Sequence, residues 1–207
     1  MFLTLDLSEN NLQYLFGEEG SGAGGFSLEL MDRLKSKRSV VSVVLATGYD
    51  REFIEWLFSS SEQFNDDFGE KWQVVIPAKK KINSFAGVSI DQFDLNLSKS
   101  IMETCKIDRA DLPGLLFIDF RPSYESIFVS LRDKKDEDAR RAFFEYSANV
   151  ITRAHASEET TDDEYRAAVA TNLRRNKRIA GVVSGVRRVA PAAAKAAKLL
   201  MSGGVSP

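Results

Sequence analysis

Chemistry-bearing side chains are scarce in this sequence. Its 207 residues include a single cysteine, Cys105, and a single histidine, His155. One cysteine cannot form an internal disulfide, a CxxC redox pair or a structural zinc site. One histidine excludes a metal centre built from several histidines and argues against a His-dependent catalytic triad. We therefore expect neither a metal nor a cofactor, and the pattern singles out no catalytic residue.

These two residues each have a reactive and a structural interpretation. Cys105 is either a reactive thiol or a small buried hydrophobic residue, which is how free cysteine usually behaves. His155 is either a general base or a favourable cation near the C-terminal end of a helix, and no nucleophile motif such as GxSxG accompanies it. We favour the structural interpretation of both residues.

The glycine-rich stretch 17–25 is the segment that most suggests nucleotide binding. No glycine in it is followed by Lys-Ser/Thr, and no buried strand clearly precedes it. Its composition instead indicates a flexible linker.

A polar cluster follows the first strongly hydrophobic run of the chain. It consists of Thr47, Tyr49, Asp50, Arg51 and Glu52. The spacing of Thr47 and Asp50 matches a Ser/Thr-x-x-acid pattern that caps the start of a helix, which is the simpler role for Asp50. Because the cluster comes directly after a predicted strand, its members are also candidates for contact with a ligand or a partner.

Hydrophobic periodicity predicts alternating strands and helices around this cluster. Short apolar, β-branched runs indicate strands, and apolar residues three and four apart indicate helices. The expected strands are 40–46, 72–76, 115–120 and 126–131, and the expected helices are 26–37, 50–64, 94–105 and 136–154. Alternating leucines around a polar turn also predict an N-terminal hairpin over 2–16. The connection 121–125 is too short for a parallel crossover, so the last two strands should pair antiparallel.

From about 39 to 155, the order β-α-β, α, β-β, α resembles that of the thioredoxin-like superfamily. The pattern alone gives an α/β protein with a mixed sheet. The resemblance implies a thioredoxin-like mixed four-stranded sheet flanked by helices, in which the β-α-β unit and the β-hairpin share one sheet. Pro113 adds to it, because thioredoxin-like proteins usually place a cis-proline directly before this strand, facing the active site.

The sequence departs from this family where the family's chemistry lies. In thioredoxins the CxxC motif opens the first helix after the first strand, whereas this chain has Thr47-Gly48-Tyr49-Asp50 there. Thiolate attack requires a cysteine. The resemblance therefore implies the fold without thiol–disulfide or peroxidase activity, and it implies that Pro113 and the polar cluster form an edge for a ligand or partner.

The net charge of −2 hides a division along the chain. No acidic residue follows Glu164, and the segment after it carries nine bases. The remaining residues hold 19 bases and 30 acids, a balance of −11 against +9. Such asymmetry suggests that the basic segment meets an anionic surface, which is a nucleic acid, a membrane, a partner or the acidic body itself.

The basic segment is expected to form a helical arm. An acidic, hydroxyl-rich start at 160–164 predicts one helix, an apolar stripe over 179–190 predicts an amphipathic helix, and Pro191 precedes an alanine-rich helix. The arm residues expected to contact an anion or a partner are Arg174, Arg175, Lys177, Arg178, Arg187, Arg188, Lys195 and Lys198.

These patterns predict three regions and a binding function. The regions are 1–37, a hairpin, linker and helix; 38–156, the thioredoxin-like domain; and 157–207, the basic arm. We expect a non-catalytic interaction module that docks on a protein partner or self-associates through the arm. The alternatives are an anionic-surface binder held on a membrane or nucleic acid, and a ligand-binding enzyme of non-thiol type. The N-terminus lacks the basic start of a signal peptide and no run of 18 apolar residues occurs, so we expect a cytoplasmic protein.

Overall fold

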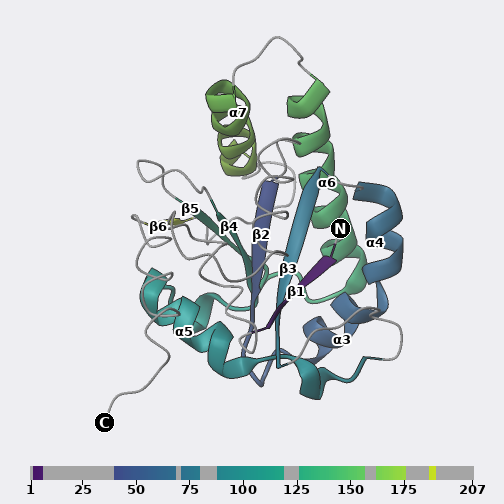
Figure 1. Ribbon diagram of the computed structural model, residues 1–207, viewed down its shortest axis with the longest axis vertical. Helices are drawn as coiled ribbons and strands as arrows, with labels where there is room; N and C mark the ends of the chain where they lie inside the picture. Colours follow the sequence, from purple (N-terminus) through teal and green to yellow (C-terminus); the bar gives the residue numbers. More distant parts are fainter. Residues whose placement is uncertain are drawn as a thin grey trace, which may run out of the picture.

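One mixed β-sheet with helices on both faces forms the body of the protein in the computed structural model (Figure 1). The structure describes residues 2–6, 40–68, 71–79, 88–118, 126–156, 162–175 and 187–189. The strands are β1 (Phe2–Asp6), β2 (Val40–Leu45), β3 (Trp72–Ala78), β4 (Gly114–Ile118), β5 (Ser126–Ser130) and β6 (Arg187–Val189). The helices are α3 (Arg51–Ser59), α4 (Ser61–Phe68), α5 (Leu95–Cys105), α6 (Glu137–Ala156) and α7 (Asp162–Arg175), with 3-10 turns η2 (Ile90–Gln92) and η3 (Arg109–Asp111). The predicted α/β class is confirmed.

The strands lie in the order β1-β3-β2-β4-β5-β6. β1 and β2 run parallel to β3, whereas β4 runs antiparallel to β2 and β5 antiparallel to β4. In this register Val43 of β2 lies between Val75 of β3 and Leu116 of β4. The four strands predicted from the sequence are thus the contiguous set β3-β2-β4-β5, and β1 and β6 extend the sheet to six strands.

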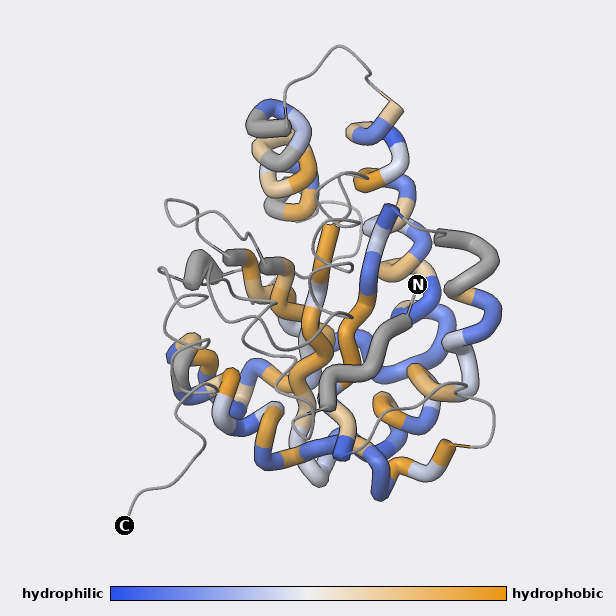
Figure 2. The backbone as a smooth tube through the Cα atoms, in the orientation of Figure 1, coloured by the Kyte–Doolittle hydropathy of each residue, from blue (hydrophilic) through white to orange (hydrophobic). Residues whose placement is uncertain are grey.

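Strand β2 is the centre of the sheet. All six of its residues are buried, because helices cover both faces and side chains that alternate between the faces are equally removed from water. This explains why the strand is a nearly continuous apolar run in the sequence. In Figure 2, β2 and the middle of β3 appear as the hydrophobic segments at the core of the molecule.

Aromatic side chains fill the face of the sheet that α3, α4 and α6 cover (Figure 1). Phe144 of α6 has ring centroids at 5.5 Å from Trp56, 4.8 Å from Phe64 and 5.4 Å from Trp72. The Trp72 indole N–H donates to the buried Ser42 hydroxyl at 3.0 Å, so this polar atom is satisfied inside the core. Each aromatic pair contributes about 0.5–1.5 kcal/mol beyond area burial, and together they join three helices to the sheet.

Helix α5 contacts β2 and β3 and lies on the other side of the sheet (Figure 1). Its residues Leu97, Ile101 and Cys105, spaced four apart, are all buried. This spacing places them on one stripe of the helix, as the predicted helix over 94–105 requires. The opposite stripe of α5 is therefore left for the surface.

The sequence predicted one helix over 50–64, and the structure contains two. α3 ends at Ser59 and α4 begins at Ser61. The Ser59 hydroxyl donates to the Trp56 carbonyl oxygen at 2.9 Å, and the Ser61 hydroxyl donates to the Phe58 carbonyl oxygen at 2.7 Å. Serine side chains that bond the backbone locally compete with helix continuation, which accounts for the break in the serine run 59–61.

The region predicted as a basic arm contributes two described elements that contact the body. α7 begins at Asp162, close to the predicted start, and its residues Tyr165, Val169 and Leu173 are buried in the main core. The Tyr146 hydroxyl of α6 donates to the Asn172 carbonyl oxygen of α7 at 3.3 Å. α7 therefore packs against α6.

The prediction of an amphipathic helix over 179–190 is wrong at its C-terminal end. Arg187, Arg188 and Val189 form β6, which pairs antiparallel with β5. The helical spacing of valines suggested a helix, but β-branched residues also favour strands, and the open edge of β5 offered unpaired backbone groups. Lys177, Arg178, Lys195 and Lys198 lie outside the described residues.

At the N-terminus, the first strand of the predicted hairpin is present as β1. It pairs in parallel with β3, with Phe2 opposite Val74. The second strand of that hairpin, the glycine-rich stretch and the helix predicted over 26–37 lie outside the described residues. No helix in the described part of the chain is both long and apolar enough to cross a membrane.

Candidate functional site

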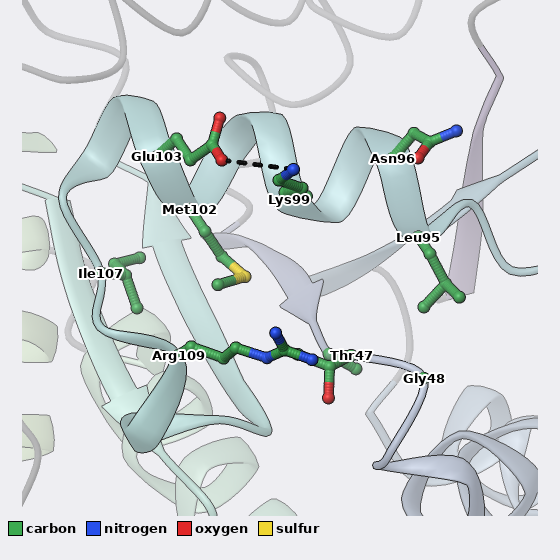
Figure 3. Close-up of a pocket in the computed structure, with 10 residues that line it drawn as sticks. Thr47, Gly48, Leu95, Asn96, Lys99, Met102, Glu103, Ile107 and Arg109 are labelled. Atoms are coloured by element: carbon green, nitrogen blue, oxygen red, sulfur yellow. Dashed lines mark ion pairs between the residues drawn. The ribbon is translucent and has the colours of Figure 1, made fainter.

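A cavity of about 460 Å³ opens where β2 ends, between the turn that follows this strand, α5 and η3 (Figure 3). Polar and apolar residues line it in similar numbers. They are Ala46, Thr47, Gly48, Leu95, Asn96, Lys99, Met102, Glu103, Ile107 and Arg109. We call this cavity the α5–η3 pocket.

A buried serine fixes α5 beside the end of β2. The Ser98 hydroxyl donates to the Ala46 carbonyl oxygen at 2.8 Å and accepts from the Ala46 amide at 3.0 Å. Ser98 is fully buried, and Ala46 is only 2% exposed. Because both backbone groups lie beyond the last residue of β2, this side chain replaces the sheet partner that they lack.

The two ends of α5 set which residues face the pocket. At the start, the Asp94 carboxylate accepts from the Asn96 and Leu97 amides at 3.0 and 2.9 Å, so the helix begins at Leu95. At the end, Lys106 adopts a left-handed φ of 53°, and the following Ile107 amide donates to the Met102 carbonyl oxygen at 2.9 Å. This cap turns the chain back, so Ile107 lines the pocket beside the helix.

η3 forms the wall opposite the end of β2, and β5 and the residues directly after it hold η3 in place. The Ser130 hydroxyl donates to the Asp111 carbonyl oxygen at 2.5 Å, and the Arg132 guanidinium donates to the Ala110 carbonyl oxygen at 2.8 Å. The Asp108 carboxylate accepts from the Ala110 amide at 2.9 Å and caps the 3-10 turn. These bonds fix the backbone from which the Arg109 side chain extends.

The turn 47–50 is held by its own side chains. The Asp50 carboxylate accepts from the Thr47 amide and from the Thr47 hydroxyl, both at 2.7 Å. The Thr47 hydroxyl oxygen in turn accepts from the Tyr49 amide at 3.3 Å. The predicted capping pattern is therefore only partly confirmed. The Asp50 carboxylate bonds to Thr47, as the pattern requires, but the helix begins at Arg51 and the Thr47 hydroxyl does not cap it.

Tyr49 and Arg109 meet at the rim of the pocket. Tyr49 is 87% exposed, and the Arg109 guanidinium carbon lies 5.2 Å from the centroid of its ring. Such a cation–π contact contributes about 0.5–1 kcal/mol at an exposed site. It links the turn after β2 to η3 across the mouth of the pocket.

Two of the three charged side chains of the lining pair with each other. Lys99 and Glu103 approach to 3.7 Å on the outer stripe of α5, and both are largely exposed. Water screens such a pair, which contributes little to stability. Arg109 makes no ion pair with any carboxylate among the described residues.

The structure brings only part of the predicted edge to the pocket. Thr47 lines it and Tyr49 stands at its rim, whereas Arg51 pairs with Glu55 at 2.9 Å on the exposed side of α3. Glu52 is exposed on the same helix. Pro113, whose peptide bond with Leu112 is cis, is not a lining residue.

Other predicted candidates lie elsewhere. Of the arm residues, Arg174 and Arg175 end α7, and Arg187 and Arg188 lie on β6. Cys105 is the last residue of α5 and is buried, and burial raises the pKa of its thiol to about 12, so a reactive thiolate is disfavoured. His155 packs edge-on to Tyr165, with ring centroids 5.9 Å apart. Over the described residues, no group of histidine, cysteine and acidic side chains is arranged to hold a metal ion.

Sequence reasoning missed the pocket residues of α5 and η3. Leu95, Lys99 and Met102 are spaced four and three apart, which places them on one stripe. Leu95 and Met102 are apolar and fit a core-facing helix by their spacing, yet Leu95 is 43% exposed. The mixture of apolar and charged residues on this stripe was the sequence feature that could have indicated a binding surface. The sequence does not show which segment lies opposite the stripe.

The pocket offers an apolar floor with polar groups around it, which suits binding. Thr47 alone among the lining residues carries a hydroxyl, and its bond to Asp50 belongs to the local turn. No cysteine, histidine or serine lines the pocket. No family model, no curated protein and no solved structure matches this chain.

Proposed function

We propose that this protein is a non-catalytic, thioredoxin-like binding module that docks a protein partner at the α5–η3 pocket and the adjoining turn 47–50. The observation that carries the proposal is the exposure of Tyr49 and Leu95. They are the two large hydrophobic side chains exposed among the described residues, and Leu95 lines the pocket whose rim Tyr49 borders. Single exposed apolar residues are ordinary, but two beside one cavity are typical of recognition sites.

Two further features support the thioredoxin-like part of the proposal. The parallel pair β2–β3 and the antiparallel pair β4–β5 share one sheet, which is the arrangement that the resemblance implies. The cis bond at Pro113 directly precedes β4, where the resemblance expects it. The absence of a cysteine at Thr47–Asp50, together with the buried Cys105, favours recognition over redox catalysis.

Peptide selection tests this function. Peptides of twelve random residues would be selected for binding to the full chain, and their affinities would be measured by fluorescence anisotropy. Replacement of Tyr49 with alanine, or of Leu95 with alanine, should weaken binding about 10-fold or more, since burial of such a side chain contributes about 1.5–3 kcal/mol. Binding should also shift amide resonances in 47–50 and 95–109, and mass spectrometry should show the peptides unaltered.

A matched control is Arg153→Gln, at an exposed position on α6. It should leave every selected peptide's affinity unchanged. Peptides that bind both pocket variants as tightly as the wild type would contradict docking at this edge. Peptides that return chemically altered would favour the non-thiol enzyme instead.

The charge division along the chain favours a second candidate, a binder of anionic surfaces. Nine bases and no acid follow Glu164, and eighteen residues of that segment follow β6. Removing 190–207 spares the buried residues of α7, unlike a deletion from 166, which would remove Val169 and Leu173 from the core. The interaction module instead predicts that the full chain binds a protein partner or a second copy through this segment. Light scattering of the full chain and of the chain without 190–207 measures self-association.

The same two forms of the protein are also tested for binding to nucleic acid and to liposomes. Binding of a DNA duplex that falls steeply between low and high salt, and that requires 190–207, would favour a nucleic-acid surface. Flotation of the full chain with anionic liposomes but not neutral ones would favour a membrane surface. Loss of a salt-insensitive self-association on truncation supports the interaction module.

A further inference from the structure

We infer that the α5–η3 pocket receives the C-terminal residue of a partner polypeptide, with its carboxylate at Arg109 and its apolar side chain on the pocket floor. This inference rests on the proposed docking function and specifies its ligand. A chain terminus is the peptide feature that joins a carboxylate and a side chain on one carbon atom. The pocket likewise places a cation, Arg109, and an apolar surface close together.

The apolar surface is the floor of the pocket. Met102 and Ile107 are 7% and 8% exposed, and Figure 3 shows the Met102 side chain pointing into the space between Ile107 and Arg109. Leu95 lies at the other end of the same helix stripe, facing Gly48 (Figure 3). A thioether and two branched aliphatic groups accept side chains of varied shape, because methionine fills irregular gaps. The cavity of about 460 Å³ falls within the range of small-ligand sites.

Arg109 is the group suited to the carboxylate. Its guanidinium presents planar donors that match a carboxylate in a two-bond geometry. Figure 3 shows the side chain extending from η3 toward Thr47, across the mouth of the pocket. The Tyr49 ring at 5.2 Å restricts this otherwise mobile side chain, so less conformational freedom is lost when a ligand binds.

The charges around the pocket leave Arg109 as its uncompensated cation. Glu103 is opposed by Lys99 at 3.7 Å. The Asp50 carboxylate is occupied by the Thr47 amide and hydroxyl, both at 2.7 Å. A cationic ligand would find no free carboxylate among the lining residues, so complementarity favours an anion.

The experiment compares two labelled pentapeptides against the full-length protein. Both end in leucine and carry fluorescein at the N-terminus, but one has a free C-terminal carboxylate and the other an amide. Affinities are measured by anisotropy for the wild type, for Arg109→Gln and for Arg153→Gln. Octanoate serves as an unlabelled competitor, because it has a carboxylate and an apolar body without a peptide.

We expect the free acid to bind at least 10-fold more tightly than the amide. Arg109→Gln should weaken binding of the free-acid peptide at least 10-fold and leave the affinity for the amide peptide unchanged, so that the two affinities become equal. Arg153→Gln should change neither affinity. A Gly48→Leu variant, which fills the pocket from the facing wall without altering charge, should weaken both peptides. Unchanged melting temperatures would show that the variants are folded.

Several outcomes would overturn the inference. Equal affinity for acid and amide, or an acid affinity insensitive to Arg109→Gln, would exclude carboxylate recognition. Binding of octanoate without binding of the acid peptide would exclude a polypeptide terminus as the ligand. If selected peptides still dock at this edge in these cases, the interaction module stands and only the ligand assignment fails; if none docks there, both proposals fail.

Discussion

Replacing Ser98 with alanine should loosen α5 from the end of β2 and disturb the pocket between them. The Ser98 hydroxyl donates to the Ala46 carbonyl oxygen at 2.8 Å and accepts from the Ala46 amide at 3.0 Å. Both residues are buried, at 0% and 2% exposure. The alanine variant would leave two backbone groups without this partner in a place that water does not reach.

The expected loss of stability follows from the two backbone groups of Ala46 that would lose their partner. A buried donor or acceptor left unsatisfied costs about 1–3 kcal/mol. The higher helix propensity of alanine offsets up to ~0.5 kcal/mol of this loss in the free energy of unfolding. The free energy of unfolding should therefore fall by about 2–5 kcal/mol, which lowers the melting temperature by roughly 4–20 °C for a chain of this size. A typical domain is stable by about 5–15 kcal/mol, so most of the protein should remain folded.

Urea unfolding measures this loss, with the fluorescence of the buried Trp56 and Trp72 as the signal. The matched control is Ser100→Ala on the same helix, where the hydroxyl donates to the Asn96 carbonyl oxygen at 3.0 Å within the helix itself. That variant should change stability by less than about 0.5 kcal/mol. A loss below about 1 kcal/mol for Ser98→Ala, or an equal loss in both variants, would refute the bridging role.

Two other perturbations have clear expectations. A Cβ at Gly114 would overlap the Phe128 ring, so Gly114→Ala should lower the free energy of unfolding by about 1–3 kcal/mol or more. Gly48→Ala, whose Cβ would lie 3.7 Å from Leu95, should change it by less than about 0.5 kcal/mol. Burial raises the pKa of Cys105 from 9.0 to about 12. The unfolded chain therefore ionises first, so above pH 9 the wild type should lose stability relative to Cys105→Ala, by at most ~1.4 kcal/mol per pH unit.

Urea unfolding of the glycine variants and pH-dependent unfolding of the cysteine variant provide these measurements. Equal stability of the two glycine variants would contradict the close approach of β4 and β5. Parallel pH profiles for wild type and Cys105→Ala would contradict the buried thiol. So would rapid maleimide labelling of Cys105 in the native protein at pH 8.

Most of the body could be predicted because its signals are local. The β-branched run 40–45 predicts a buried strand without knowledge of its neighbours, and the short connection 121–125 predicts the antiparallel pairing of β4 with β5. Where two local signals competed, the prediction failed. The serine run 59–61 divides a helix that apolar spacing alone extended, and the valines near Val189 suit a strand as well as a helix.

The candidate site was only half predictable. The turn Thr47–Asp50 follows a strand and is recognisable in the sequence, and its position at an edge of the sheet follows from the order of elements. Its partners are not recognisable, because Arg109 and Met102 come from segments far along the chain. Their relevance depends on how α5 is held against β2 by Ser98 and where the cap at Lys106 turns the chain.

The sequence by itself therefore determined the α/β elements, the charge division and the lack of thiol chemistry at Thr47–Asp50, since composition and periodicity are properties of neighbouring residues. Only the tertiary structure decided that α7 packs on α6, that Arg187–Val189 pairs with β5, and that Arg109 contacts Tyr49 at the α5–η3 pocket. These features depend on distances between remote segments, which packing against the shared sheet sets and no local pattern encodes.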